Sequence, residues 1–225
     1  MGKIKELREE VKTVFSGRSI KLLDTILPLF VFLLGNTLFG LNPALLGALA
    51  AAILLTGYRL IQGENLLYAL AGIGGVMLSA GFVRISGSEA GFFLPGLFSG
   101  GITVLLCLGS TAVKRPLAAW SSYLTRRWPL KWYWHSKVRP AYTEVTLIWA
   151  VASGARTGLE YWLFQREAIN ALGVVKVILG WPYTILVLIF SYLYGIWRLG
   201  NLMGPSVNEF TSGVEPPWIG QKRGF

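Results

Sequence analysis

The sequence predicts an all-α fold, an integral membrane bundle of about six transmembrane helices with a basic aromatic interfacial loop. Hydrophobic residues make up 53% of the 225 residues and charged residues only 14%, against about 25% charged residues in an average soluble domain. Long stretches almost free of charge combine 27 Gly with 13% aromatic residues, a mixture typical of transmembrane helices. The formal net charge of +10 makes anionic lipid the first partner to expect. This composition argues against an ordinary soluble enzyme.

The first segment, residues 1–19, is predicted to be a cytoplasmic amphipathic helix. Ile4, Leu7 and Val11 recur at helical spacing with charged residues between them, as in a helix with one apolar face. The mixed charge and the lack of a small-residue cleavage site disfavour a removable signal peptide. Residues 20–41 therefore form a retained first span, because 22 residues reach about 33 Å, enough for a hydrocarbon core of about 30 Å.

Apolar segments of similar length follow, separated by short polar turns. The expected spans are residues 20–41, 43–61, 66–83, 91–113, 141–164 and 181–199. They divide the membrane part into helices one to four, within 20–113, and helices five and six, within 141–200. Small residues at helical spacing predict close helix packing; these are Ala71, Gly75 and Ser79, and the pair Gly96 and Gly100.

The sixth span is less clean than the others. Residues 171–180 are apolar around Lys176, and Pro182 would kink a continuous helix. This stretch is therefore either interfacial or part of the sixth span. Residues 201–225 turn polar and are expected to form a cytoplasmic tail without a core of its own.

The distribution of cations predicts the orientation. Lys and Arg near short loops favour the cytoplasmic side. With the N-terminus inside, 17 of the 21 Lys and Arg residues lie on the cytoplasmic side. The sequence therefore predicts a multi-pass protein of the bacterial inner membrane with both termini in the cytoplasm.

The long loop, residues 114–140, is rich in cations and aromatic rings and contains no acidic residue. Leu117, Trp120, Leu124 and Trp128 follow one another at helical spacing, as in an interfacial helix on anionic lipid. We expect lipid contacts from eight residues of this loop: Arg115, Trp120, Arg126, Arg127, Trp128, Lys131, Trp132 and Trp134. A protein partner would suit the same residues. Basic and aromatic residues also suit single-stranded nucleic acid. A loop tethered to the membrane explains these residues without nucleic acid, so we expect no nucleic-acid partner.

Arg156 and Glu160 form an oppositely charged pair inside the fifth predicted span. Their i, i+4 spacing places both on one helix face. An ionisable residue within the membrane is a functional candidate by default. Two interpretations stay open, which are mutual neutralisation and participation in an ion, proton or head-group path.

The other reactive residue types do not assemble into a catalytic or metal-binding pattern. Asp24 lies near the end of the first span, and Glu144 reads as an exposed carboxylate at the start of the fifth. His135 has no Cys or acidic neighbour for a metal, and Cys107 lies in an apolar span where a thiol is inert. We therefore expect no enzyme, no catalytic residues and no metal site, and the sequence leaves the identity of any cofactor unknown.

Several short patterns, taken in order, resemble a family of small bacterial membrane proteins of unassigned function, the intracellular septation protein A-like group. The patterns are Tyr58-Arg59-Leu60, the run from Gly87 to Gly96, Lys114-Arg115-Pro116-Leu117, Thr146-Leu147-Ile148-Trp149 with Arg156, Leu172-Gly173 and Gly180-Trp181-Pro182. The resemblance implies a polytopic inner-membrane protein linked to envelope growth or division, with no established active site.

Two functions from different classes follow from these observations. The preferred one is a non-enzymatic accessory or scaffolding protein that packs against lipids, a larger membrane complex or further copies of itself. The alternative is a small ion- or proton-coupled transporter or channel, because proline-interrupted spans at membrane depth often line a binding site. Lipid, pigment and quinone are not distinguished by the sequence.

Overall fold

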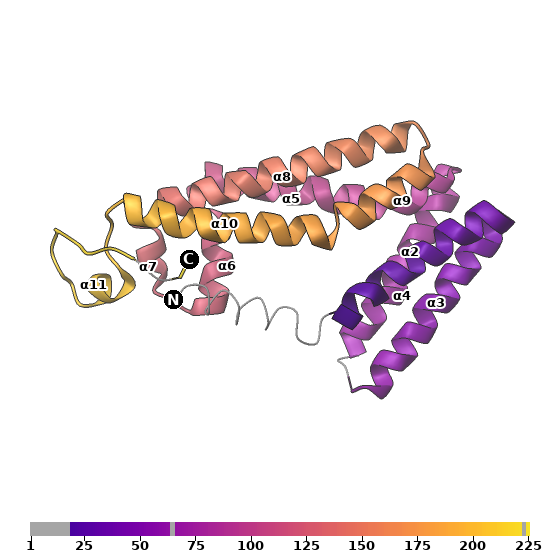
Figure 1. The fold of residues 1–225 in the computed structure, drawn as a ribbon, viewed down its shortest axis with the longest axis horizontal. Helices are drawn as coiled ribbons and strands as arrows, with labels where there is room; N and C mark the ends of the chain where they lie inside the picture. The colour runs from indigo at the N-terminus through magenta and orange to yellow at the C-terminus, as the bar shows by residue number, and fades with distance from the viewer. Residues whose placement is uncertain (1–18, 64–65, 222–223) are drawn as a thin grey trace. The chain divides into compact units, whose positions relative to one another are not determined.

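The computed structural model describes residues 19–63, 66–221 and 224–225, and within them all regular structure is helical (Figure 1). The all-α prediction is therefore confirmed. The chain divides into two compact units: unit 1 comprises residues 1–95 and 162–181, and unit 2 comprises residues 96–161 and 182–225. The amphipathic helix predicted for residues 1–19 lies outside the described residues, apart from Ser19.

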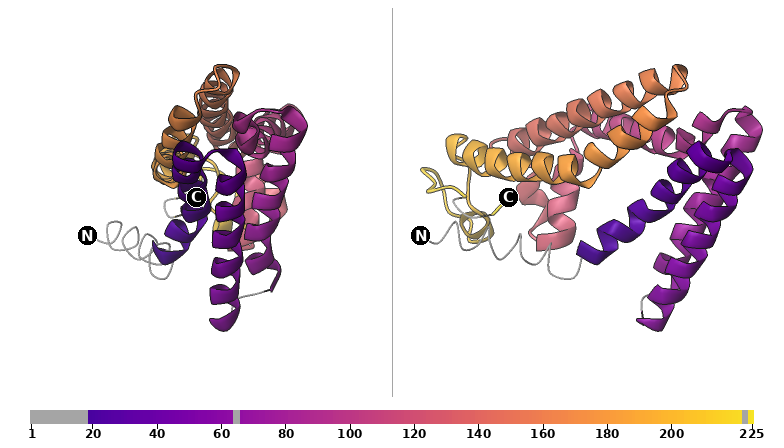
Figure 2. Two further views of the ribbon diagram at one scale, coloured as in Figure 1. Left: turned by 90° about the vertical axis from the view of Figure 1, so that its right-hand side faces the viewer. Right: turned by 45° about the vertical axis from the view of Figure 1, so that its right-hand side comes forward.

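Unit 1 is built on three helices that pack in chain order (Figure 2). These are α2 (Ser19–Phe39), α3 (Leu41–Ile61) and α4 (Leu66–Ser86). Gly40, with a φ of 81°, turns the chain between α2 and α3. A Cβ added at Gly35 would lie 3.0 Å from the Cα of Ala44, so this glycine permits the close approach of the hairpin that the sequence predicts.

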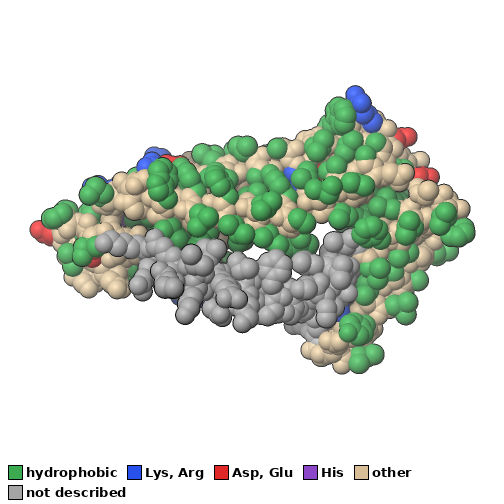
Figure 3. All heavy atoms as spheres, in the orientation of Figure 1, with side chains coloured by type: hydrophobic (Ala, Val, Ile, Leu, Met, Phe, Trp, Pro, Cys, Tyr) green, Lys and Arg blue, Asp and Glu red, His purple; other side chains and the backbone are tan. Residues whose placement is uncertain are grey.

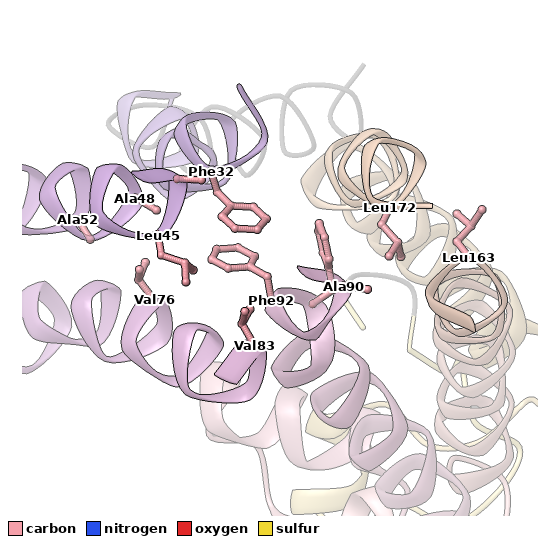
Figure 4. Packing of buried hydrophobic residues seen from close by; sticks show 12 residues of the cluster. Phe32, Leu45, Ala48, Ala52, Val76, Val83, Ala90, Phe92, Leu163 and Leu172 are labelled. Atoms are coloured by element: carbon pink, nitrogen blue, oxygen red, sulfur yellow. The ribbon is translucent and has the colours of Figure 1, made fainter. Parts of the chain in front are cut away.

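The core of unit 1 is aliphatic and phenylalanine-rich (Figure 4). The rings of Phe32 on α2 and Phe92 are stacked with centroids 4.0 Å apart. Phe92 belongs to η1 (Glu89–Phe93), a buried turn of 3-10 helix capped by Ser88, whose Oγ accepts the Ala90 N–H. This turn overlaps the start of the fourth predicted span, residues 91–113, and packs on α4 and on α9 (Ile169–Ile178).

Unit 2 contains three long helices and three short ones. They are α5 (Leu94–Ala112), α6 (Leu117–Arg126), α7 (Leu130–Tyr133), α8 (Arg139–Gln165), α10 (Trp181–Asn201) and α11 (Val207–Thr211). The first residues of α5 and α10 and the last residues of α8 belong to unit 1. Thr157 of α8 packs against Gly100 of α5, which confirms the predicted close packing at Gly100. The Tyr183 hydroxyl of α10 donates to the Ala152 carbonyl of α8 over 3.1 Å.

Three helical segments of the described residues are long and apolar enough to cross a membrane, namely Leu41–Ile61, Glu89–Ala112 and Ile169–Asn201. Leu27–Phe39 and Leu70–Ser86 are apolar but shorter. The expected number of about six spans therefore stays a prediction, whereas a helical chain with membrane-spanning segments is what the structure supports. Hydrophobic side chains cover much of the helix surfaces on the face shown in Figure 3.

One detail of the predicted spans needs correction. Gly75, expected to pack closely, has an open position where an added Cβ meets nothing within 4 Å, because α4 turns Val76 and Val83 inward instead. At the end of α3, Tyr58 is exposed and Arg59 is buried.

Candidate lipid-binding site

The loop of residues 114–140 folds into the two short helices α6 and α7 of unit 2. Pro116 precedes α6, and Arg127 ends it in the left-handed conformation, with a φ of 57°. Pro129 then precedes α7, and proline disfavours helical geometry in the residue before it. These punctuating residues divide one basic stretch into two helices.

The start of α6 is fixed by two hydroxyl groups. The Ser110 Oγ accepts the Leu117 N–H over 3.2 Å, and the Thr146 Oγ1 on α8 accepts the Ala118 N–H over 3.1 Å. The first N–H groups of a helix have no partner within the helix, so these bonds replace water and hold α6 against α8.

Trp132, predicted to contact lipid, is instead fully buried in the core of unit 2. Its Nε1–H donates to the Pro205 carbonyl over 2.8 Å. Tyr133 beside it is also fully buried, and its hydroxyl pairs with the Ser122 Oγ over 3.1 Å. Burial raises the pKa of Tyr133. A buried indole needs a partner for its N–H, and Trp132 has one inside the protein, so it is not available to lipid in this structure.

A cation and two indoles form a connected array on the surface of unit 2, which we call the interface array: Arg115, Trp120 and Trp134. The Arg115 guanidinium lies 4.4 Å from the ring centroid of Trp134, and the rings of Trp120 and Trp134 are 5.8 Å apart. Trp120 is 40% exposed, and Leu124, one turn further along α6, is 63% exposed. Arg115 itself is exposed, so the array offers both charge and apolar surface.

The remaining predicted lipid ligands divide into two groups. Arg127 and Lys131 are exposed. Arg126 and Trp128 are half-buried and face the end of the chain: the Arg126 guanidinium lies 5.1 Å from the Trp128 ring centroid, and its Nε–H donates to the main-chain oxygen of Phe225 over 3.0 Å.

The polar segment of residues 201–225 was expected to lack a core, but its described residues, 201–221 and 224–225, pack against the rest of unit 2. Leu202, Val207, Phe210 and Phe225 lie against the buried cluster that contains Trp132. Glu209 accepts the N–H groups of Ser206, Ile219 and Gly220, over 2.8, 2.7 and 3.3 Å. These bonds lower the pKa of Glu209 to about 2. A few apolar residues among the polar ones hold this segment against the rest of unit 2. Its largely polar composition does not predict this packing.

His135 is half-buried beside two rings of that segment. Its ring centroid is 6.2 Å from Phe210 and 5.4 Å from Trp218. Its Nδ1 accepts the Lys137 N–H over 3.3 Å. Burial and then the charge of Lys137 lower the pKa of His135, so the neutral imidazole is the form that this site holds. No cluster of three or more metal-ligating side chains occurs in residues 19–63, 66–221 and 224–225.

The pair of Arg156 and Glu160 forms as its spacing predicts. The Arg156 Nε–H donates to the Glu160 Oε1 over 2.8 Å, and Glu160 is 2% exposed.

A second ion pair was missed by the sequence analysis. Glu144, expected to be an exposed carboxylate, accepts bonds of 2.7 and 2.8 Å from Arg198 and one of 2.8 Å from the Tyr194 hydroxyl. Arg198 lies 54 residues away on α10, and no local pattern indicates this partner.

A family model with the description "Protein of unknown function (DUF3159)" matches residues 17–196. The chain belongs to this family. The DUF3159 match includes the interface array and the Arg156–Glu160 pair, whereas Arg198 and the packed segment that ends at Phe225 follow it. No curated protein and no solved structure matches the chain. Membership of DUF3159 accords with the expected family of unassigned function, and the resemblance to the septation protein A-like group stays a prediction.

Proposed function

We propose that this chain is a non-enzymatic accessory or scaffolding protein of the bacterial inner membrane, and that its interface array binds anionic lipid head groups. The observation that carries the proposal is the connected contact of Arg115, Trp134 and Trp120, with Leu124 exposed one turn away. Indole rings favour the head-group level of a bilayer, and each cation near an anionic surface contributes about 1 kcal/mol. A role in envelope growth or division belongs to the same proposal and rests on the septation-protein resemblance.

The proposal is tested on the full chain, because Trp132 and Tyr133 complete their core with residues outside the loop. The protein is reconstituted in phosphatidylcholine nanodiscs with and without phosphatidylglycerol, and lipid binding is measured by quenching of Trp fluorescence with head-group-brominated lipid. We expect stronger quenching by the brominated anionic lipid. The triple change of Arg115, Arg127 and Lys131 to Ala should weaken that preference roughly a hundredfold.

A matched control removes exposed cations elsewhere in the chain. Arg84→Ala combined with Arg166→Ala, both exposed and outside the loop, should leave the preference for the anionic lipid intact. Equal quenching by the neutral and the anionic lipid in the parent protein would contradict the proposed ligand. Trp120→Ala with Leu124→Ala should reduce quenching by both lipids, because these side chains supply apolar contact without charge.

The orientation that belongs to this proposal has its own test. Ser136 lies in the basic loop and is exposed. A Ser136→Cys variant in a Cys107→Ala background should be protected from a membrane-impermeant thiol reagent in intact cells. Labelling from the periplasm would reverse the proposed orientation.

The alternative function, a small ion- or proton-coupled transporter or channel, rests on Glu160. Its pairing with Arg156 within one helix supplies a structural reason for both charges, which favours the accessory function. If Glu160 carries protons or ions, Glu160→Gln should abolish a flux that the parent protein supports in proteoliposomes. A parent protein without flux for protons and common ions removes this alternative.

A further inference from the structure

The ring of Phe225 fills a slot in unit 2 whose walls come from three helices. It stacks on Tyr142 of α8 with ring centroids 4.3 Å apart and an interplanar angle of 12°. The ring also lies directly against Gly195 of α10. Arg126 of α6 donates from Nε to the Phe225 main-chain oxygen over 3.0 Å. The slot therefore combines a flat aromatic wall, a floor without a side chain and a hydrogen-bond donor.

Glycine is required on both sides of this contact. A Cβ at Gly195 would lie 2.5 Å from Cγ and 2.6 Å from Cδ1 of Phe225, so any other residue would displace the ring. Gly224 has a φ of 76°, and a Cβ there would lie 2.8 Å from the Arg126 Nη1 and 3.2 Å from Cη2 of Trp128. The site therefore fits a glycine followed by a flat ring, with no room for a further side chain at either glycine.

We propose that this slot is a peptide-binding site for a glycine followed by an aromatic residue, and that residues 224–225 of the chain fill it in cis. The ring stacks on Tyr142, the missing side chain of Gly195 admits the full ring width, and Arg126 reads the main-chain oxygen. A branched or charged side chain in place of the ring loses the flat contact with Tyr142. The site is independent of lipid binding by the interface array, although the bond to Phe225 keeps Arg126 facing the protein.

The test uses the full chain in detergent and a fluorescent peptide of residues 214–225. Phe225→Ala empties the slot, and the peptide should then bind, as measured by fluorescence anisotropy. The parent protein should bind it roughly tenfold or more weakly, because its own segment competes at an effective concentration of about millimolar. A peptide with Ala in place of its Phe should bind neither protein.

A pair of glycines on α10 supplies the matched control. Gly195→Ala in the Phe225→Ala background should abolish peptide binding, because the new methyl group occupies the slot. Gly200→Ala should leave binding unchanged, since a Cβ there meets nothing within 4 Å. Both changes gain the same helix propensity, so a difference between them reports the slot alone. Equal peptide binding by all of these proteins would overturn the proposal.

A second measurement covers the case in which Phe225→Ala does not fold. In the otherwise native chain, Gly195→Ala should expel the Phe225 ring while Gly200→Ala does not. Trypsin cleavage after Lys222 and Arg223, followed by mass spectrometry, should then be several-fold faster in Gly195→Ala than in Gly200→Ala or the parent protein. Equal cleavage rates in the three proteins would show that Gly195 does not hold the segment.

Discussion

The cores of the two units of this protein are built from different kinds of side chain. In unit 1 the core consists of stacked phenylalanines, aliphatic side chains and close glycine contacts, with Phe32 on Phe92 at its centre. In unit 2 the largest core side chains are Trp132, Tyr133 and Tyr142, and the first two form hydrogen bonds with Pro205 and Ser122. Shape therefore determines what the core of unit 1 tolerates, whereas the core of unit 2 depends in addition on the hydrogen bonds of its own aromatic side chains.

The largest expected effect is on Trp132. Trp132→Ala should lower the free energy of unfolding by about 3–5 kcal/mol, because it leaves a large cavity. Trp132→Phe keeps a ring but removes the N–H donor to Pro205, and an unsatisfied buried acceptor costs about 1–3 kcal/mol. Chemical denaturation followed by near-ultraviolet circular dichroism measures both changes.

Trp197, on α10 and largely exposed, is the matched control for Trp132. Trp197→Ala should change the free energy of unfolding little. A Trp132→Phe variant as stable as the parent protein would contradict a polar requirement in unit 2.

The second prediction tests the dependence of unit 1 on shape. A Cβ at Gly91 would lie 2.9 Å from the Phe82 carbonyl oxygen and 3.0 Å from the Val83 Cα. Gly91→Ala should therefore destabilise the protein by about 1–3 kcal/mol through overpacking. Gly81→Ala is the control, because a Cβ there meets nothing within 4 Å. Equal melting temperatures of the two variants would argue against tight packing around η1.

The elements could be predicted from the sequence much better than their contacts. Each predicted span coincides with a helix because an apolar run of about 20 residues has little alternative in a membrane. Which face of each helix is buried could not be predicted, since α4 is apolar all round and offers no polar stripe. Gly75 illustrates this, because it was assigned to packing and is open.

The sequence predicted which residue types make up the candidate site, but only partly which of these residues are exposed. Arg115 and Trp120 lie on the surface as expected, whereas Trp132 is buried. An indole suits a membrane interface and a hydrogen-bonded core equally well. The choice depends on Pro205, 73 residues later, and local patterns do not encode that distance. The pairing of Glu144 with Arg198 could not be predicted for the same reason, since these residues are 54 positions apart.

The third prediction concerns the Arg156–Glu160 pair, an ionic contact within one helix. Arg156→Ala or Glu160→Ala alone should destabilise the protein by leaving the other charge without this partner, and the double change should recover much of the loss. An ion pair at i, i+4 stabilises an isolated helix by about 0.2–0.5 kcal/mol, and polar contacts in membrane proteins reach at most about 1.7 kcal/mol, so we expect a coupling energy between these values. A double-mutant cycle of denaturation midpoints measures it, and additive effects would exclude a structural role.

The smallest expected effect is the pH dependence contributed by His135. Its pKa is lowered in the folded protein, so the unfolded chain binds the proton first as the pH falls. The stability that the neutral His135 ring contributes is fully present above the unfolded pKa of about 6.5. It decreases as the pH falls below that value. Between pH 8 and about pH 5 the melting temperature should drop less in His135→Phe than in the parent protein. Identical pH profiles would show that the surroundings of His135 do not favour the neutral ring.

The bond from Trp132 to the Pro205 carbonyl also sets an order of events during biosynthesis. Domains fold as units while the chain is still being made, yet this indole finds its acceptor only when residues 73 positions later have left the ribosome. Until then α6 and α7 have an incomplete core, and Trp132 and Tyr133 lack the cover that Leu202, Val207 and Phe210 provide. During synthesis the basic stretch of residues 114–140 therefore exposes more aromatic surface than it does in the folded protein. This surface becomes buried when the last residues of unit 2 pack against it.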